Sequence, residues 1–348
     1  MGGGSFSSKS HRSAVAGLAS RGQTFARSHT AKSTGKYDDI AEALNPRKLK
    51  DGMRESCYTE GFDDVLPIVY GLDLTASMGT VPAFLQGELP NVLDMVVEQD
   101  ITDHPNVMVI GFDDEHCIND AAFQMSQFEI EHDKLANALN EMIIPEMGGG
   151  NNGEAYHIFF YALAHHTRLE CFEQEGKKGF AFLVCDEPPY YNNGDPSTEG
   201  MKPALAKELF GDSFETEKTM LESVRKASEM YHLFCIRPQD TCHGSDPRVH
   251  KMWVDMFAQA DLSPDHVIQV ESREDVIPTT AMCIGRLHGF DGDALVDVLK
   301  GKGVAGAQAA GAATQALTAY DGAGGSIVAA DGTINGDLAL AGSGRRRS

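Results

Sequence analysis

The chain contains 348 residues and has a formal charge of −22, from 51 acidic and 29 basic side chains. The charge is unevenly divided, because residues 1–54 contain ten basic and four acidic residues, whereas the remainder contains 19 basic and 47 acidic residues. An acidic body repels phosphate, which argues against nucleic-acid binding by this larger part. The basic segment is suited to nucleic acid, to an acidic surface or to the acidic body of the same chain.

Other features argue against a membrane or secreted protein. The longest apolar runs are far shorter than the ~20 residues of a membrane-spanning helix, and the first thirty residues lack the apolar block of a secretory signal. The seven cysteines are scattered, and no two of them form a C-x-x-C pair. This usage is typical of free thiols in a reducing cytosol, so we expect a cytoplasmic location.

The pattern of apolar and polar residues along the chain predicts its strands and helices. Residues 1–54 form a basic, Ser/Gly-rich segment with weak periodicity, which predicts an arm that orders on a partner. From residue 65 onward, short apolar runs alternate with stretches of helical periodicity. The expected strands cover residues 65–72, 106–112, 179–185, 231–236 and 266–270, with a short edge strand or hairpin within 121–130. The expected helices cover residues 81–98, 133–144, 154–169, 202–209, 216–230, 246–260 and 273–287.

Strands that alternate with helices predict an α/β domain, which we place at residues 55–292. We expect a doubly wound, Rossmann-like, mostly parallel sheet with helices on both faces. Residues 293–348 are rich in Gly and Ala, and three arginines stand near the end. This composition predicts a tail without a core of its own.

Polar side chains follow two of the expected strands. Asp73, Thr75 and Ser77 come directly after the first strand in a D-x-T-x-S pattern, and Asp186 and Glu187 follow the fourth strand along the chain. Ligands of doubly wound sheets bind beyond the carboxyl ends of the strands, so we expect these groups at one edge. The first segment is also typical of a helix N-cap, and the second is also consistent with a solvated turn.

A glycine-rich loop over residues 148–153 carries Asn151 and is followed by Glu154 at the start of a helix. Carboxylate, hydroxyl and amide oxygens, with no converging His or Cys, are the ligands of a hard cation such as Mg²⁺. Asp113 and Asp114 follow the second strand at the same edge. We expect a solvated acidic loop there rather than an extension of the site.

The D-x-T-x-S pattern, the glycine loop and the aspartate at a strand end together resemble the von Willebrand factor type A domain and its metal-ion-dependent adhesion site. The resemblance covers roughly residues 65–290, about two thirds of the chain. The family's first motif matches Asp73, Thr75 and Ser77, and its third motif matches Asp186.

The second motif departs from the family pattern. The family has a Thr in its glycine-rich loop, whereas this sequence has Asn151 as the nearest equivalent and Glu154 as an alternative ligand. The blocks at 124–129, 148–156 and 177–187 also look like a bacterial and phage branch of this superfamily.

The resemblance implies a bound Mg²⁺, with Mn²⁺ or Ca²⁺ as alternatives, and it implies these five ligands: Asp73, Thr75, Ser77, Asn151 and Asp186. It further implies that an open coordination position accepts an Asp or Glu carboxylate from a partner protein. Domains that look like this one work beside AAA+ ATPases of the MoxR kind as adaptors. The chain is then a binding module and not an enzyme.

Two other functions stay open. A structural or assembly protein of a phage or a cell-surface appendage would use the basic arm and the Gly/Ala-rich tail for self-association. A metal-dependent phosphohydrolase would use the same cation in catalysis. No G-x-S-x-G elbow or Ser/His/Asp order points to a nucleophile, which favours binding over catalysis.

Overall fold

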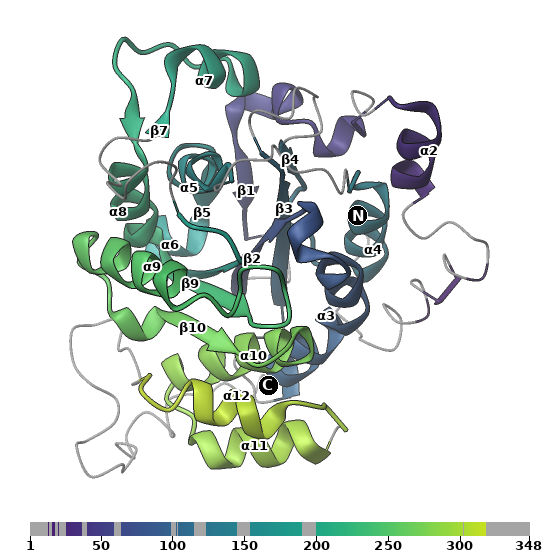
Figure 1. Cartoon of the computed structure of the whole chain (residues 1–348), viewed down its shortest axis with the longest axis vertical. Coiled ribbons are helices and arrows are strands. Elements are labelled where there is room, and N and C mark those ends of the chain that lie inside the picture. Colours follow the sequence, from purple (N-terminus) through teal and green to yellow (C-terminus); the bar gives the residue numbers. More distant parts are fainter. Residues whose placement is uncertain are drawn as a thin grey trace, which may run out of the picture.

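A six-stranded sheet lies at the centre of the chain in the computed structural model (Figure 1). The strand order is β10-β9-β6-β2-β3-β4, and all neighbours are parallel except β3 and β4. The strands are β2 (Val65–Asp73), β3 (His104–Phe112), β4 (Phe123–Met125), β6 (Gly179–Val184), β9 (Tyr231–Pro238) and β10 (Val267–Val270). The structure describes residues 13, 16–17, 20, 26–36, 40–58, 64–98, 102, 104–114, 123–144, 154–189, 200–301 and 303–317.

The mixed α/β class and the mostly parallel sheet that the sequence predicts are confirmed. The apolar runs form the strands because both faces of the sheet are covered, so the nine residues of β2 are all buried. The edge strand expected within 121–130 is the short antiparallel β4. Further short pairs join β1 (Arg54–Ser56) to β5 (Thr167–Leu169) and β7 (Gly200–Met201) to β8 (Lys218–Thr219).

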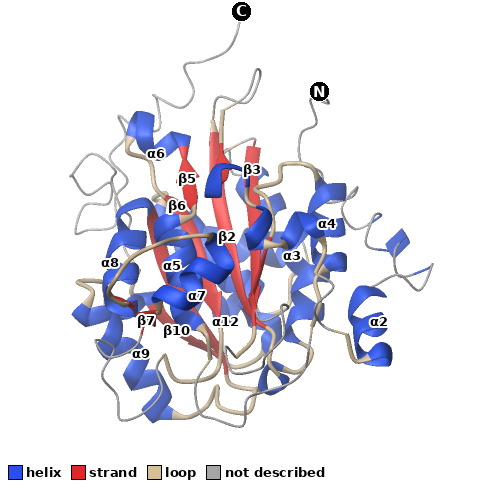
Figure 2. Cartoon of the chain, turned by 90° about the horizontal axis from the view of Figure 1, so that it is seen from above, coloured by secondary structure: helices blue, strands red, loops and turns tan. Residues whose placement is uncertain are grey.

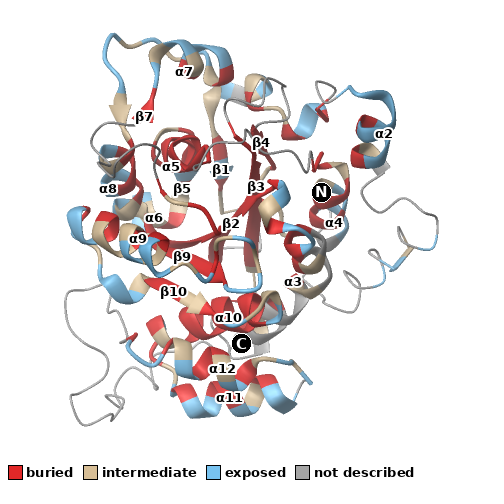
Figure 3. Cartoon of the chain, in the orientation of Figure 1, coloured by how far each residue is buried: buried red, intermediate tan, exposed pale blue. Residues whose placement is uncertain are grey.

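Helices lie on both sides of the sheet, and most of the sheet is buried (Figures 2 and 3). The helices pack on the strands through two separate apolar clusters. Ile68 and Tyr70 of β2 belong to the cluster that includes α3 and α10, whereas Val69 between them belongs to the cluster that includes α5, α8 and α9. Successive side chains of a strand point to opposite faces, so the two clusters lie on opposite sides of β2. The helices are α3 (Val81–Glu98), α4 (His132–Glu141), α5 (Tyr156–His165), α6 (Glu170–Glu175), α7 (Pro203–Phe210), α8 (Met220–Met230), α9 (Pro247–Gln259) and α10 (Val276–Leu287).

A glycine in β2 sets the distance between this strand and α5. A Cβ at Gly71 would lie 2.4 Å from the ring of Phe159 in α5, so no larger residue fits there without displacing that ring. The close approach brings Tyr156, the first residue of α5, to the carboxyl end of β2.

The described part of the basic N-terminal segment packs on the body of the same chain. The helix α2 (Ala26–Thr34) lies beside α4, where Arg27 forms an ion pair of 2.9 Å with Glu141. Nearer the sheet, Arg47 pairs with Glu208 at 2.8 Å, and Leu44 is 1% exposed. Nucleic acid, an acidic surface and the acidic body of the same chain all suit the basic segment. In the structure, the described part of this segment contacts the acidic body of the same chain.

The first part of the Gly/Ala-rich region is helical and packed. The sequence predicts a tail over residues 293–348, whereas α11 (Gly292–Gly301) and α12 (Ala307–Ala313) pack on α10. Leu295 is 1% exposed and touches the face of α10 at Gly285, where a Cβ would lie 2.5 Å from its Cδ1. Residues 318–348 lie outside the described part.

None of the helices in the described ranges combines the length and the apolar character needed to cross a membrane.

The packing of α11 predicts the effect of shortening Leu295. We expect Leu295→Ala to lower the free energy of unfolding by about 2–5 kcal/mol, because it leaves a cavity against α10. Urea denaturation followed by circular dichroism measures this loss. Asp297→Ala, an exposed position on the same helix, should change stability by less than about 0.5 kcal/mol. Equal effects of the two variants would contradict the packed position of α11.

Candidate functional site

The predicted site residues lie at the carboxyl edge of the central strands. Asp73 is the last residue of β2, and Thr75 and Ser77 follow in a turn that contains the short 3₁₀ helix Ala76–Met78. Asp186 lies two residues beyond the end of β6. Because β6 pairs in parallel with β2, both strand ends point to the same edge of the sheet.

Four of the five predicted side chains form one hydrogen-bonded run. The Thr75 hydroxyl donates to Asp73 Oδ1 at 2.6 Å, and its Oγ1 lies 2.9 Å from Ser77 Oγ. The Ser77 hydroxyl donates to Asp186 Oδ1 at 2.9 Å. The fifth residue, Asn151, lies outside the described residues.

The hydroxyls of this run do not cap the helix that follows. Thr75 occupies the N-cap position of the 3₁₀ helix but makes no side-chain capping bond there. Its hydroxyl is directed to Asp73 instead, and the hydroxyl of Ser77 is directed to Asp186. The geometry therefore differs from the N-cap alternative that the D-L-T-A-S segment suggested.

Asp73 is held in a fully buried position by three donors. Its Oδ1 accepts the backbone N–H and the hydroxyl of Thr75, and its Oδ2 accepts the hydroxyl of Tyr156 at 2.8 Å. Burial raises the pKa of Asp73 to about 8, with a further contribution from the charge of Asp186, while the hydrogen bonds act in the opposite direction. The carboxylate form is thus costly in the absence of a nearby cation.

Four more carboxyl groups are buried at this edge, each less than 10% exposed: Asp113, Asp114, Glu154 and Glu187. The solvated acidic loop expected at Asp113 and Asp114 is therefore wrong, and the solvated turn suggested for Asp186 and Glu187 is not observed. The reason is geometric, because β3 is the parallel neighbour of β2 and ends at the same covered edge.

Burial also raises the pKa values of this second group of carboxyls. It raises the pKa of Asp113 to about 7. For Glu154, burial and then the charge of Asp73 raise the pKa to about 11. One oxygen of each of these two groups is buried and has no hydrogen-bond partner among the described residues. The edge consequently carries more acid groups than its own donors satisfy.

A buried arginine connects Asp186 to the loop between β9 and α9. Arg237 is fully buried, and its Nη2 donates to the backbone carbonyls of Asp186 at 3.0 Å and His243 at 2.8 Å. The backbone N–H of His243 donates to Asp186 Oδ2 at 3.1 Å, and its Nε2 lies 3.2 Å from Glu187 Oε1. The loop also reaches the first motif, since the N–H of Cys242 donates to the carbonyl of Ser77 at 3.4 Å.

Sequence reasoning did not identify Tyr156, Arg237 or His243 as site residues. Arg237 directly follows a run expected as a strand, so its place at the same edge was accessible from the parallel-sheet pattern. Tyr156 stands just after the glycine loop, which was a weaker signal. His243 reaches the site only because its loop folds back over Asp186, and no local pattern indicates this.

The donor set fits a hard cation better than a transition metal. Two carboxylates and two hydroxyls offer only oxygen atoms, which suit Mg²⁺ or a similar ion. Within the described ranges, no three His, Cys, Asp or Glu side chains converge to hold a metal ion, so the hydroxyls of Thr75 and Ser77 would have to complete such a site. The buried acid groups make this edge favourable for a cation and unfavourable for an anion.

The role of Arg237 can be tested by removing its charge. We expect Arg237→Met to lower the free energy of unfolding by about 3 kcal/mol or more, because two carbonyls and the nearby carboxylates lose a buried cation. Chemical denaturation is the measurement. Arg248→Met removes an 87% exposed guanidinium and should cost less than about 1 kcal/mol. Similar losses in both variants would show that Arg237 does not hold the edge together.

Comparisons with known proteins give only weak likenesses. No family model matches the chain, and no curated protein matches it. Two crystal structures of the pilus adhesin SpaC from Lactobacillus rhamnosus GG cover 67% and 72% of this chain, with 13% and 12% identity and a TM-score of 0.40. Proximal thread matrix protein 1 from the mussel byssus covers 65%, with 11% identity and a TM-score of 0.36. This chain spans about a third of the adhesin (32% and 31%) and about half of the byssus protein (48%). Likenesses this weak define neither a family nor a function for the chain.

Proposed function

We propose that the chain is a metal-dependent protein-interaction module of the von Willebrand factor A type. In this proposal, Mg²⁺ is held by Asp73, Thr75, Ser77, Asp186 and the predicted Asn151. The observation that carries the proposal is the hydrogen-bonded run from Asp73 through both hydroxyls to Asp186, which brings two separate sequence motifs to one point.

The arrangement of the sheet supports a doubly wound fold of this kind. The D-x-T-x-S motif follows β2, a central strand, and the aspartate of the third motif follows its parallel neighbour β6. Helices lie on both sides of β2, in two apolar clusters. In such folds, ligands bind at this end of the strands.

Each residue has a distinct part in the proposed site. The hydroxyl oxygens of Thr75 and Ser77 lie between the two carboxylates in the hydrogen-bonded run, and Asp73 and Asp186 supply the negative charge. Tyr156 holds Asp73 in place by donating to its Oδ2. A bound Mg²⁺ would supply an open coordination position for a partner's carboxylate. The surrounding buried acids would repel any anionic partner that does not reach the ion, which gives selectivity.

Binding is a better proposal than catalysis for these residues. The hydroxyl of Ser77 donates to Asp186 and lies beside Thr75, and among the described residues no histidine is hydrogen bonded to it as a general base. We propose a partner that presents Asp or Glu, with an adaptor role beside a MoxR-type AAA+ ATPase suggested by the sequence resemblance alone.

A cytoplasmic location is supported by the cysteines in the described ranges, all of which are free thiols.

Metal binding is tested first by thermal unfolding. We expect millimolar Mg²⁺ to raise the Tm of the wild-type chain by several degrees, because an ion that binds only the folded state stabilises it. Asp73→Asn should not respond to Mg²⁺, because the substitution removes a carboxylate ligand of the ion. Asp297→Asn, at an exposed position, should respond like the wild type. An equal response of all three proteins would contradict the proposed site.

Partner binding is tested by affinity capture from native lysate, with and without EDTA, for the wild type, Asp73→Asn and Asp297→Asn. We expect the same partner with the wild type and Asp297→Asn, and its loss with EDTA or Asp73→Asn. Recovery of the same proteins under every condition would overturn the metal-dependent interaction. Self-association that survives EDTA would instead favour the assembly function, and Mg²⁺-dependent turnover of a generic phosphoester would favour the hydrolase.

A further inference from the structure

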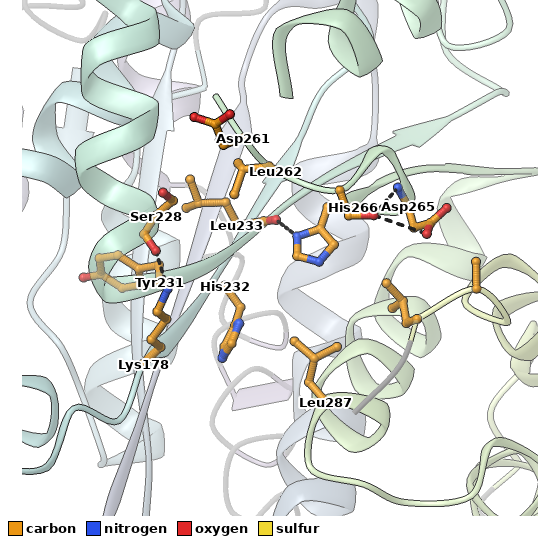
Figure 4. Close-up of a pocket in the computed structure, with 13 residues that line it drawn as sticks. Lys178, Ser228, Tyr231, His232, Leu233, Asp261, Leu262, Asp265, His266 and Leu287 are labelled. Carbon is orange, nitrogen blue, oxygen red and sulfur yellow. Dashed lines mark hydrogen bonds between the residues drawn. The ribbon is translucent and has the colours of Figure 1, made fainter. Parts of the chain in front are cut away.

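A cavity of about 290 Å³ lies at the opposite end of the sheet from the acid-rich edge (Figure 4). It opens where β6, β9 and β10 begin, whereas Asp73 and Asp186 lie where strands end. Its wall includes Lys178 just before β6, His232 at the start of β9 and His266 just before β10. A volume of this order suits a small organic molecule.

Part of the wall is apolar. Four leucines from four different parts of the chain contribute to it: Leu233, Leu262, Leu287 and Leu317. An aromatic row continues behind the histidines, since the ring of His266 stacks on Phe234 at 4.4 Å and the ring of His232 lies 5.1 Å from that of Phe180. A ligand therefore has an apolar surface to bury, either an aliphatic chain or a ring.

The polar part of the wall combines one ammonium group with two imidazoles. Lys178 Nζ donates to the carbonyl of Ser228 at 2.7 Å, which holds the ammonium at the cavity (Figure 4). His266 Nδ1 donates to the carbonyl of Leu233 at 2.9 Å, which fixes the ring and leaves Nε2 as an acceptor. Burial, and then the charge of Lys178, lower the pKa of His232 to about 3, so its ring is neutral at pH 7.

These charges select the class of ligand. The ammonium of Lys178 attracts an anion and repels a metal cation from the neighbouring imidazoles. At the rim, Asp261 and Asp265 are exposed and add negative charge, only part of which is offset by Arg225, 3.9 Å from Asp261. A single negative charge next to Lys178 is favoured under these conditions, whereas a multiply charged phosphate meets repulsion from the rim.

We propose that this cavity binds a small monocarboxylic acid with an apolar body, its carboxylate on Lys178 and its chain or ring against the leucines. The ring of His232, at the start of β9, lines the same cavity. The site is independent of the acid-rich edge, so it does not depend on the proposed metal-dependent function.

Isothermal titration calorimetry of the full chain at pH 7.5 tests the proposal with three probes. 4-Phenylbutyrate carries both the charge and the apolar body, 4-phenylbutanamide has the same body without the charge, and inorganic phosphate has charge without the body. We expect saturable binding of 4-phenylbutyrate at one site and at least ~10-fold weaker binding of the other two, since a charge-assisted hydrogen bond is lost or an apolar contact is missing.

Variants locate the binding. Lys178→Met should weaken 4-phenylbutyrate binding at least ~10-fold, and Ala316→Phe, at an exposed position of the rim, should weaken it by obstruction without disturbing the core. Lys207→Met, which removes an exposed lysine of α7, should bind like the wild type. Thermal unfolding of each variant confirms that it is folded.

Two results would overturn the proposal. One is a wild-type chain that does not bind 4-phenylbutyrate saturably or binds the amide equally well. The other is equal affinity of Lys178→Met, Ala316→Phe and Lys207→Met, which would place the binding elsewhere on the molecule.

Discussion

The constraint on which the structure depends is the burial of six carboxyl groups at one edge of a parallel sheet. Parallel strands end at a common edge, so the pairing of the strands is enough to bring together acidic residues that are far apart in the sequence. Their mutual repulsion and lost hydration oppose folding. The neighbouring structure offsets this cost with the hydroxyls of Thr75, Ser77 and Tyr156 and with the buried guanidinium of Arg237.

Dense packing of aromatic rings holds the buried carboxyl groups and their hydrogen-bond donors in fixed positions. The rings behind the edge form a continuous group, in which Tyr156 lies 5.2 Å from Trp253 and 5.4 Å from Phe112, measured between ring centres. Trp253 in turn donates its Nε1–H to the carbonyl of Glu187 at 2.9 Å. Helix α9 is thus bonded to the third motif, while α5 is bonded to the first through Tyr156. A cation entering the edge would meet donors whose positions are already set by the core.

Much of the architecture could be predicted because it depends on local patterns. The strand at 65–72 extends to Asp73 in the structure and the helix at 81–98 coincides with α3, since apolar runs and helical spacing are read directly from neighbouring residues. The meeting of Asp73 with Asp186 was also accessible, because it follows from parallel pairing. The burial of Asp113 and the packing of Leu295 were not, since both depend on which distant surface covers a segment. The Gly/Ala-rich composition of residues 293–348 predicted a tail, although Leu295, Val296 and Leu299 give the first part of this segment an apolar face.

One contact of the N-terminal helix fixes the segment that follows α4. The hydroxyl of Ser28 in α2 donates to the carbonyl of Met142 at 3.0 Å and accepts the N–H of Ile144 at 2.7 Å. Ile143 between them is held by the side-chain amide of Gln124 through its N–H and its carbonyl. The segment that carries Asn151 begins immediately after these anchored residues. The basic helix therefore holds the segment after α4 in place, and a partner that pulls α2 away from the body would remove these hydrogen bonds from the carbonyl of Met142 and the N–H of Ile144.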